Sequence, residues 1–259
     1  MPGEKEEFIL KMRNNNDNLN NVIFGIWPIV EALREAKPFN KIMIQKGNTS
    51  EELEEIYALA KEQNVPIQSV PPQKLARITR KNHQGVIGYT SPIEFLDIEE
   101  VLTGIFESGE TPFIVCLDKI TDVRNFGAIC RTAEAAGVNA ILIPEKEAAQ
   151  IGADAIKTSA GAIFNLKICR SKAFIKAVQY IKDSGVKIVC CTEKSSQHYK
   201  EGKYDGPIAL VMGSEDNGVS PSIIRISDYN AMIPMKGKTG SLNVSVAAGI
   251  LLYEMSEQH

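Results

Sequence analysis

The sequence predicts an α/β protein with two domains, in which the larger, C-terminal domain is built on a mostly parallel sheet. The chain has 259 residues, of which 44% are hydrophobic and 24% charged, a composition typical of a folded chain long enough for two domains. Short apolar runs typical of strands alternate with longer segments typical of helices. In the C-terminal part these runs are almost continuously apolar, as in strands covered on both faces.

The N-terminal domain is expected over residues 21–90. Residues 1–20 are charged and then rich in Asn, which favours a flexible tail. From residue 22 onward, strand-like and helix-like segments alternate and end near residue 90. We expect strands at 22–24, 41–45, 67–70 and 85–89, and helices at 28–36, 50–63 and 71–79.

A linker is expected over residues 91–111, because an acidic helix at 94–106 leads into the turn sequence SGETP. The C-terminal domain then covers residues 112–259. Its expected strands are 113–117, 140–143, 162–168, 186–191, 208–212 and a short one from 231, and its expected helices are 126–136, 153–160, 172–183 and the segment after 243. Parallel sheets bind ligands beyond the carboxyl ends of their strands, so the candidate binding loops follow Leu117, Cys191, Met212 and Ile233.

Composition excludes several classes of protein. The N-terminus is charged and no apolar run is long enough to span a membrane, so we expect a cytoplasmic protein without a membrane partner. The five Cys residues form no C-x-x-C pair and the three His residues have no metal-ligand spacing, so we expect reduced core thiols and no metal. The net charge is −3, and residues 111–259 hold 17 Lys and Arg against 15 Asp and Glu, so any nucleic-acid surface must be a local patch.

The stretch at 231–253, AMIPMKGKTGSLNVSVAAGILLY, predicts a strand, a loop and a buried helix. Ser241 or Asn243 could cap that helix, since its first N–H groups have no intrahelical partner. The alternative is that both side chains face a reacting group beside the helix N-terminus. The GKT sequence is no phosphate-binding P-loop, because that pattern requires Gly five residues before Gly237, where Met232 stands.

Two further loops follow expected strands. The first reads DKITDVRNFGAICRTAEAAG, with Asn125 near the start of the next helix and Arg131 inside it; they could be an N-cap and a surface residue. The second, after the strand at 208–212, reads GSEDNGVSP, a Gly-rich turn with Ser220 as N-cap and Pro221 at the first helical position.

One basic cluster stands out in the N-terminal domain. It lies on and after the helix expected at 71–79, and its members are Lys74, Arg77, Arg80, Lys81 and His83. Arg77, Arg80 and Lys81 are expected within one helical turn. It could be a solvated face or a surface for a polyanion.

These three loops, in this order, resemble the three conserved motifs of the SpoU family of RNA ribose 2′-O-methyltransferases. The match departs from the family at Val123, where Pro is usual. The segments VIFGIWPIVEAL and NHQGVIGY resemble the small RNA-binding domain that precedes the catalytic domain in many family members. The resemblance implies S-adenosylmethionine as cofactor, a homodimer, and a deep trefoil knot formed where the chain around 213–243 tucks through a loop.

The resemblance also implies roles for particular residues. The polar catalytic set is Asn125, Arg131, Glu215, Ser241 and Asn243. The cofactor would contact Thr192, Glu193, Gly213, Ile233, Met235, Ser241 and Leu242, and RNA would contact Lys74, Arg77, Arg80 and Lys81. For Arg131 we favour gripping a phosphate of the target nucleotide over acting as a base, because a guanidinium stays protonated in proteins.

The two-domain layout favours ribosomal RNA as the partner, and a guanosine of 23S ribosomal RNA as the target. The alternatives are transfer RNA or another ribosomal site, a catalytically silent RNA-binding protein that keeps the fold, and a small-molecule methyltransferase. The last would leave the N-terminal domain and its basic helix without a role.

Overall fold

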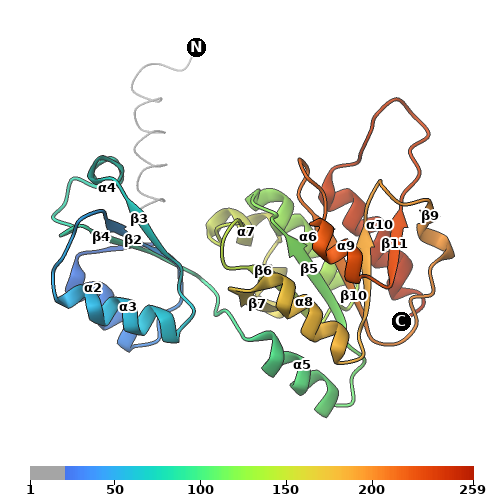
Figure 1. Cartoon of the computed structure of the whole chain (residues 1–259), viewed down its shortest axis with the longest axis horizontal. Helices are drawn as coiled ribbons and strands as arrows, with labels where there is room; N and C mark the ends of the chain where they lie inside the picture. Colours follow the sequence, from blue (N-terminus) through green and yellow to red (C-terminus); the bar gives the residue numbers. More distant parts are fainter. Residues whose placement is uncertain (1–20) are drawn as a thin grey trace. The chain divides into compact units, whose positions relative to one another are not determined.

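The computed structural model describes residues 21–259, so the tail expected at 1–20 lies outside the described residues. The chain divides into two compact units, one ending at Pro92 and the other spanning Ile93–His259 (Figure 1). Within residues 21–259, no helix is long and apolar enough to cross a membrane.

The first unit is a four-stranded sheet in the order β1-β4-β2-β3. Strand β4 is antiparallel to both β1 and β2, whereas β2 and β3 run parallel. The elements are β1 (Val22–Phe24), α2 (Ile26–Arg34), β2 (Phe39–Gln45), α3 (Glu52–Glu62), β3 (Ile67–Val70), α4 (Pro72–Ile78) and β4 (Val86–Thr90). The predicted elements are confirmed, with ends that shift by one or two residues.

The helices of this unit cover opposite faces of its sheet. Successive strand residues point to opposite faces, so Ile42 and Ile44 pack with α2 and α3, whereas Met43 packs with Leu75 of α4. Helix α4 has only seven residues, so its face is the less fully covered one. Phe24 of β1, on the α4 face, remains only partly buried.

The second unit confirms the mostly parallel sheet. Its seven strands have the order β7-β6-β5-β10-β8-β11-β9, and every neighbouring pair is parallel. The strands are β5 (Phe113–Asp118), β6 (Ala140–Pro144), β7 (Lys167–Ser171), β8 (Lys187–Cys191), β9 (Gln197–His198), β10 (Ile208–Gly213) and β11 (Tyr229–Met232). The helices are α5 (Ile98–Glu107), α6 (Val123–Ala135), α7 (Ala153–Thr158), α8 (Phe174–Asp183), α9 (Pro221–Ile226) and α10 (Val244–Ser256).

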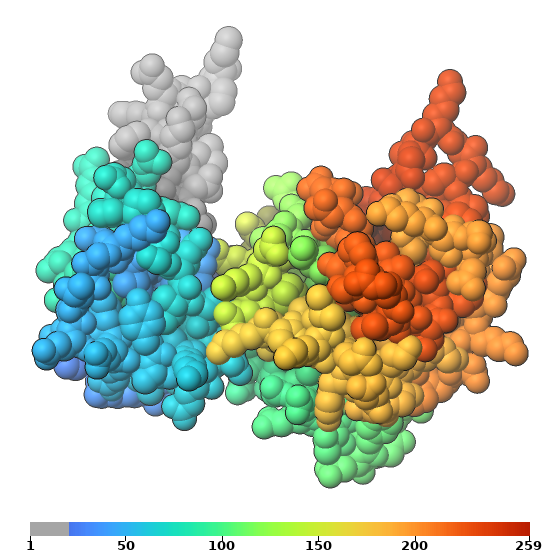
Figure 2. All heavy atoms as spheres, viewed as in Figure 1, coloured from blue at the N-terminus to red at the C-terminus, as the bar shows by residue number. Residues whose placement is uncertain are grey.

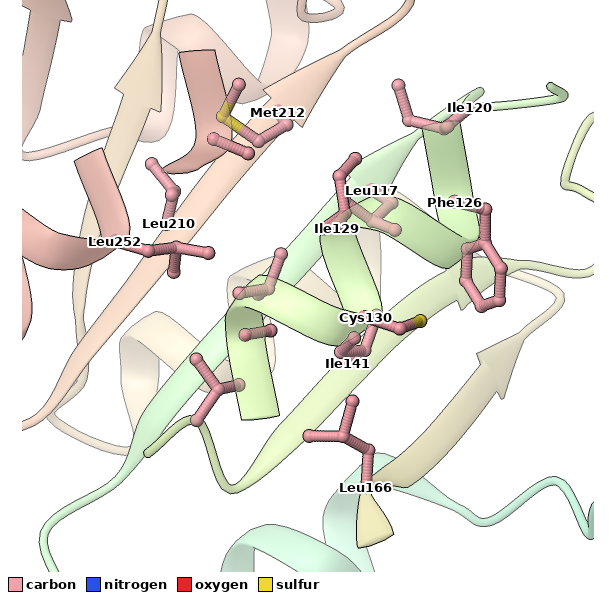
Figure 3. Close-up of a cluster of buried hydrophobic side chains, with 14 of the residues drawn as sticks. Leu117, Ile120, Phe126, Ile129, Cys130, Ile141, Leu166, Leu210, Met212 and Leu252 are labelled. Atoms are coloured by element: carbon pink, nitrogen blue, oxygen red, sulfur yellow. The ribbon is translucent and has the colours of Figure 1, made fainter. Parts of the chain in front are cut away.

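Helices cover both faces of this sheet, as continuous apolar strands require. Helices α6, α7 and α10 pack on one face, where Leu117, Phe126, Leu210 and Leu252 belong to a common buried cluster (Figure 3). Helices α5, α8 and α9 pack on the other face. Four of the five Cys residues are buried and all five are free, in agreement with core thiols.

Two predicted segments differ in the structure. The strand expected at 162–168 is a 3-10 turn, η1 (Ala162–Asn165), followed by β7 from Lys167. Gly161, at φ +85°, turns the chain after α7, so Ile163 enters the core from a turn instead of from a strand. The acidic helix expected in the linker is α5, and it packs on α8 and β7 within the second unit because its apolar face is buried there.

Strand β10 lies between β5 and β8, both of which come earlier in the chain. This order brings the carboxyl ends of β5, β10 and β8 side by side, at Asp118, Gly213 and Cys191. Asp118 is buried, and its Oδ2 accepts a hydrogen bond of 2.6 Å from Ser220 N, which ties the loop after β10 to the end of β5. The segment between β11 and α10 projects from the rest of this unit (Figure 2).

Candidate active site at the carboxyl ends of the central strands

Three polar side chains from distant segments form one hydrogen-bonded cluster, which we call the amide–carboxylate triangle (Asn125, Glu215 and Asn243). Asn125 Nδ2 donates to Glu215 Oε1 at 3.0 Å. Asn243 Nδ2 donates to Asn125 Oδ1 and to Glu215 Oε1, both at 2.9 Å. The triangle therefore joins one residue from each of the three loops that the sequence singled out.

Asn125 reaches the triangle because a neighbour caps its helix. The N-cap of α6 is Asp122, whose Oδ1 accepts from Asn125 N at 2.7 Å, so the suggestion that Asn125 itself is the cap is wrong. Val123 occupies the first helical position, where a Pro would also be favourable. With Asp122 as cap, the side chain of Asn125 is free to face the next loop.

Glu215 follows β10 in a tight turn that has a glycine at each end. A Cβ added at Gly213 would lie 2.0 Å from the backbone C of Gly218, so nothing larger fits. Gly218 has φ +65°, and its N donates to Ser214 O at 2.8 Å to close the turn. The turn holds Glu215 beside the starts of α6 and α10.

Asn243 caps α10, which is one of the two roles that the sequence allowed, and its amide nitrogen joins the triangle. It is the N-cap of α10, and its Oδ1 accepts from Ser245 N at 3.0 Å and from Ser245 Oγ at 2.6 Å. Because Oδ1 is engaged by the helix, Nδ2 is the atom that points to the triangle. Capping thus fixes the orientation of the amide.

Arg131 and Ser241 lie outside the triangle. Both are exposed, and neither side chain makes a hydrogen bond within the part of the chain that the structure describes. Arg131 lies six residues beyond Asn125 on α6, which on a regular helix is about 9 Å along the axis and about 120° around it. Ser241 instead belongs to the neighbouring cleft.

That cleft opens between the loops after β8, β10 and β11 and has a volume of ≈ 550 Å³, within the range typical of small-ligand sites. All seven residues expected to contact a cofactor line it: Thr192, Glu193, Gly213, Ile233, Met235, Ser241 and Leu242. Glu215 also lines it, so the cleft and the triangle adjoin.

The lining contains both apolar and acidic side chains. Met212, Val244 and Ala247, which the sequence did not single out, line the cleft together with Ile233, Met235 and Leu242. Three carboxylates line the cleft against one lysine: Glu193, Glu215, Asp216 and Lys194. Such a lining fits a ligand with an apolar ring and a positive charge.

The four basic residues expected to contact RNA lie in the first unit. Lys74 and Arg77 are exposed on α4, but Arg80 and Lys81 lie beyond its end, so the expectation of one helical turn for Arg77, Arg80 and Lys81 is wrong. Thr79 is buried and extended, and its Oγ1 accepts from Lys81 N at 3.1 Å, which stops the helix.

Two other features concern metal binding and the reactivity of a cysteine at the site. Among residues 21–259, no group of three or more His, Cys, Asp or Glu side chains is placed to hold a metal ion. Cys191 lines the cleft, and burial raises the pKa of its thiol to about 12. The thiol is therefore protonated at neutral pH and is a poor nucleophile.

Two family models match the chain. Residues 112–253 match the model of the SpoU rRNA Methylase family, and residues 22–96 match the model for RNA 2′-O ribose methyltransferase substrate binding. A Staphylococcus aureus (strain MSSA476) protein named as a TrmH family tRNA/rRNA methyltransferase is 33% identical over 236 residues, which are 91% of this chain and 95% of that protein.

Solved structures show the same fold. A TrmH/SpoU tRNA modifying enzyme of A. aeolicus is 35% identical, with a TM-score of 0.53 over 62% of this chain and 83% of that one. An rRNA methyltransferase of Sinorhizobium meliloti with bound AdoMet has a TM-score of 0.57 and 24% identity, and covers 91% of this chain and 86% of that one.

Proposed function

The chain belongs to the SpoU family of RNA ribose 2′-O-methyltransferases, and on that premise we propose that the amide–carboxylate triangle is its catalytic centre and the adjoining cleft its S-adenosylmethionine site. The observation that carries this proposal is the triangle itself. Its three side chains come from three separate loops, and Glu215 also lines the cleft.

The volume of the cleft and the charges of its lining support an S-adenosylmethionine site. S-adenosylmethionine supplies an activated methyl group on a positively charged sulfonium. We assign Ile233, Met235 and Leu242 to the adenine and Glu193 to the positive charge. Glu193→Gln should therefore weaken the binding of S-adenosylmethionine more than that of the product, S-adenosylhomocysteine, whose sulfur carries no charge, in calorimetry.

The triangle would hold the target ribose in line with that methyl group. The two amides hold Oε1 of Glu215, which leaves Oε2 to accept the hydrogen of the 2′-hydroxyl. As the oxygen–methyl bond forms and the carbon–sulfur bond breaks, this hydrogen passes as a proton to Oε2 of Glu215 and then to solvent, and S-adenosylhomocysteine is the leaving group. Ser241, at the rim of the cleft, would align the hydroxyl.

A second copy of the chain would complete this centre. Val246 and Tyr253, seven residues apart on one face of α10, are 51% and 53% exposed. Gly249, in the same helix, approaches Thr132 of α6, the residue next to Arg131. We assign this apolar face to a homodimer in which Arg131 of one copy grips a substrate phosphate near the triangle of the other.

Two variants test this assignment. Tyr253→Lys should shift the protein to monomers in analytical ultracentrifugation and reduce methyl transfer, because a buried ammonium opposes association. Arg131→Lys should also slow transfer, because Lys lacks the planar fork that binds a phosphate through two bonds. Parental turnover in Arg131→Lys would contradict bidentate gripping.

We also assign a trefoil knot to the C-terminal end. Strand β10 enters between two earlier strands, the chain then crosses β8 to form β11, and it returns to place α10 against α6. This path supports a chain that passes through one of its own loops.

Ribosomal RNA is the substrate we propose, with a guanosine of 23S ribosomal RNA as the methylated nucleotide. Labelled S-adenosylmethionine should transfer its methyl group to ribosomal RNA, and nuclease digestion should recover the label as 2′-O-methylguanosine. Label in transfer RNA alone would identify transfer RNA as the substrate and reject ribosomal RNA. Cofactor binding without label in any RNA would reject the catalytic assignment.

A further inference from the structure

Within residues 21–92, the acidic residues of the first unit all lie on one side of its sheet. Residues 21–92 contain seven acidic side chains, and all lie in or next to α2 and α3: Glu31, Glu35, Glu51, Glu52, Glu54, Glu55 and Glu62. Strands β1 to β4 and helix α4 contain none. Lys41, Lys74 and Arg77 belong to those elements, and Arg80 and Lys81 follow α4. The α4 side of this sheet is therefore uniformly basic.

Two aromatic rings lie under lysines on that same side. The Nζ of Lys81 is 5.3 Å from the ring centre of Phe24, and the Nζ of Lys41 is 5.2 Å from that of Tyr89. Both rings pack at the edge of the small cluster formed by α4 and the sheet, and both are only partly buried. We call this surface the aromatic–lysine face (Phe24, Lys41, Lys74, Lys81 and Tyr89).

The strand register sets the spacing of the two rings. Phe24 of β1 pairs with Ile87 of β4, and Tyr89 is two residues further along β4 on the same face. Such diagonal neighbours in an antiparallel pair are about 7–8 Å apart. Two successive nucleotides of a splayed single strand can span that separation, with one base on each ring.

Within residues 21–92, no acidic residue lies on the elements that carry these lysines, and the positive charges of Lys41 and Lys74 repel each other. Burial, and after it the positive charge of Lys74, lower the pKa of Lys41 from its ordinary value. A phosphate between the two ammonium groups would relieve this repulsion. The flexible lysine chains can move from the rings to a phosphate, which leaves the rings open to bases.

We propose that the aromatic–lysine face binds an unpaired stretch of the RNA substrate, with bases stacked on Phe24 and Tyr89 and phosphates held by Lys41, Lys74 and Lys81. This inference rests on the proposed function, because that function names RNA as the substrate. Unpaired RNA is favoured over a duplex because stacking requires bases that are free of their partners. Basic residues alone would bind either form.

The test compares ring removal on the two sides of the sheet. Phe24→Leu and Tyr89→Leu keep an apolar side chain but remove the ring, and Tyr57→Leu does the same at a 48% exposed tyrosine on α3, on the acidic side. Binding of the full chain to a short labelled single-stranded RNA of mixed sequence, and to its duplex, is measured by fluorescence anisotropy. Circular dichroism confirms that each variant is folded.

Each ring variant should bind the single strand about tenfold more weakly, because one stacked base contributes on that order. Tyr57→Leu and Tyr89→Phe should bind like the parent, since neither removes a ring from the face. The salt dependence of binding should stay unchanged in the ring variants, and its slope should fall by about one unit or less in Lys41→Gln, which loses one phosphate contact.

Parental affinity for single-stranded RNA in Phe24→Leu and Tyr89→Leu would overturn the proposal, and so would an equal loss of duplex binding. The failure of the proposed function looks different. RNA binding that depends on the rings, without methyl transfer, would reject the proposed catalysis but support RNA binding by the aromatic–lysine face. Methyl transfer with RNA binding that does not depend on the rings would support the proposed catalysis but reject RNA binding by this face.

Discussion

Asn243 performs two tasks through two different atoms, so substitutions can separate them. Its Oδ1 caps α10 through Ser245 N, and its Nδ2 donates to Asn125 and Glu215. Asn243→Ser keeps a capping oxygen without the amide donor. Asn243→Ala removes both functions, and Asn243→Asp keeps the cap but places a second carboxylate against Glu215.

The structure gives an order of stabilities for the three variants. Asn243→Ser loses two exposed hydrogen bonds, which should lower the free energy of unfolding by about 1 kcal/mol in total, the low end for two such bonds. Asn243→Ala should lose about 1 kcal/mol more, because the cap is gone. Asn243→Asp should lose about 1 kcal/mol more than Asn243→Ser through repulsion between carboxylates near 3 Å, and high salt should remove most of that increment.

The three variants should lose turnover equally, in contrast to their stabilities. All three variants lack one of the two amide donors that hold Oε1 of Glu215, so each should lower kcat about a hundredfold, as the loss of one preorganised donor does in other enzymes. Urea unfolding at low and high salt gives the stabilities, and labelled methyl transfer gives kcat. Parental kcat in Asn243→Ser would refute the reasoning, because capping alone would then account for Asn243.

Three further changes have defined outcomes. Gly213→Ala should destabilise the protein by about 3 kcal/mol or more, since its Cβ would lie 2.0 Å from Gly218 C, whereas Gly237→Ala, with nothing within 4 Å, should leave urea unfolding unchanged. Burial acts to raise the pKa of Asp228, but Lys182 at 2.7 Å and the N–H of Ile188 outweigh it and lower that pKa from 3.8. The carboxylate therefore stabilises the fold at neutral pH, and Asp228→Asn should be less stable there, with a gap that closes as the pH falls below about 4. The buried Cys thiols should react with a disulfide reagent at pH 8 only on unfolding, because burial raises their pKa values. Rapid labelling of the folded protein would show that the core opens.

Residue type predicted the components of the site but not their assembly. An Asn before an apolar helix predicts an N-cap, and the strand ends predicted the loops that line the cleft. The triangle depends on strand order, because Asn125 follows β5 and Glu215 follows β10, and these residues, 90 positions apart, meet only when the two strands are neighbours. No local pattern specifies that neighbour relation.

Local competition explains the errors. Asp122 and Asn125 can both cap a helix, and the choice was decided by where α6 starts in the packed unit. The run from Ala162 is as apolar as a strand, yet Gly161 turns it into η1. The amphipathic helix α5 resembles a linker helix in sequence because its partners, α8 and β7, come more than 50 residues later.

The hydrogen bonds of the triangle are exposed and contribute only about 0.5 kcal/mol each, so they cannot by themselves hold three loops in register. The buried scaffold does so. Leu251 and Leu252 fix α10 against the sheet, Phe126 fixes α6, and the backbone fit between Gly213 and Gly218 fixes the turn that carries Glu215. The polar side chains of the triangle can therefore be selected for chemistry, since the burial of apolar residues behind them supplies the rigidity that aligned transfer requires.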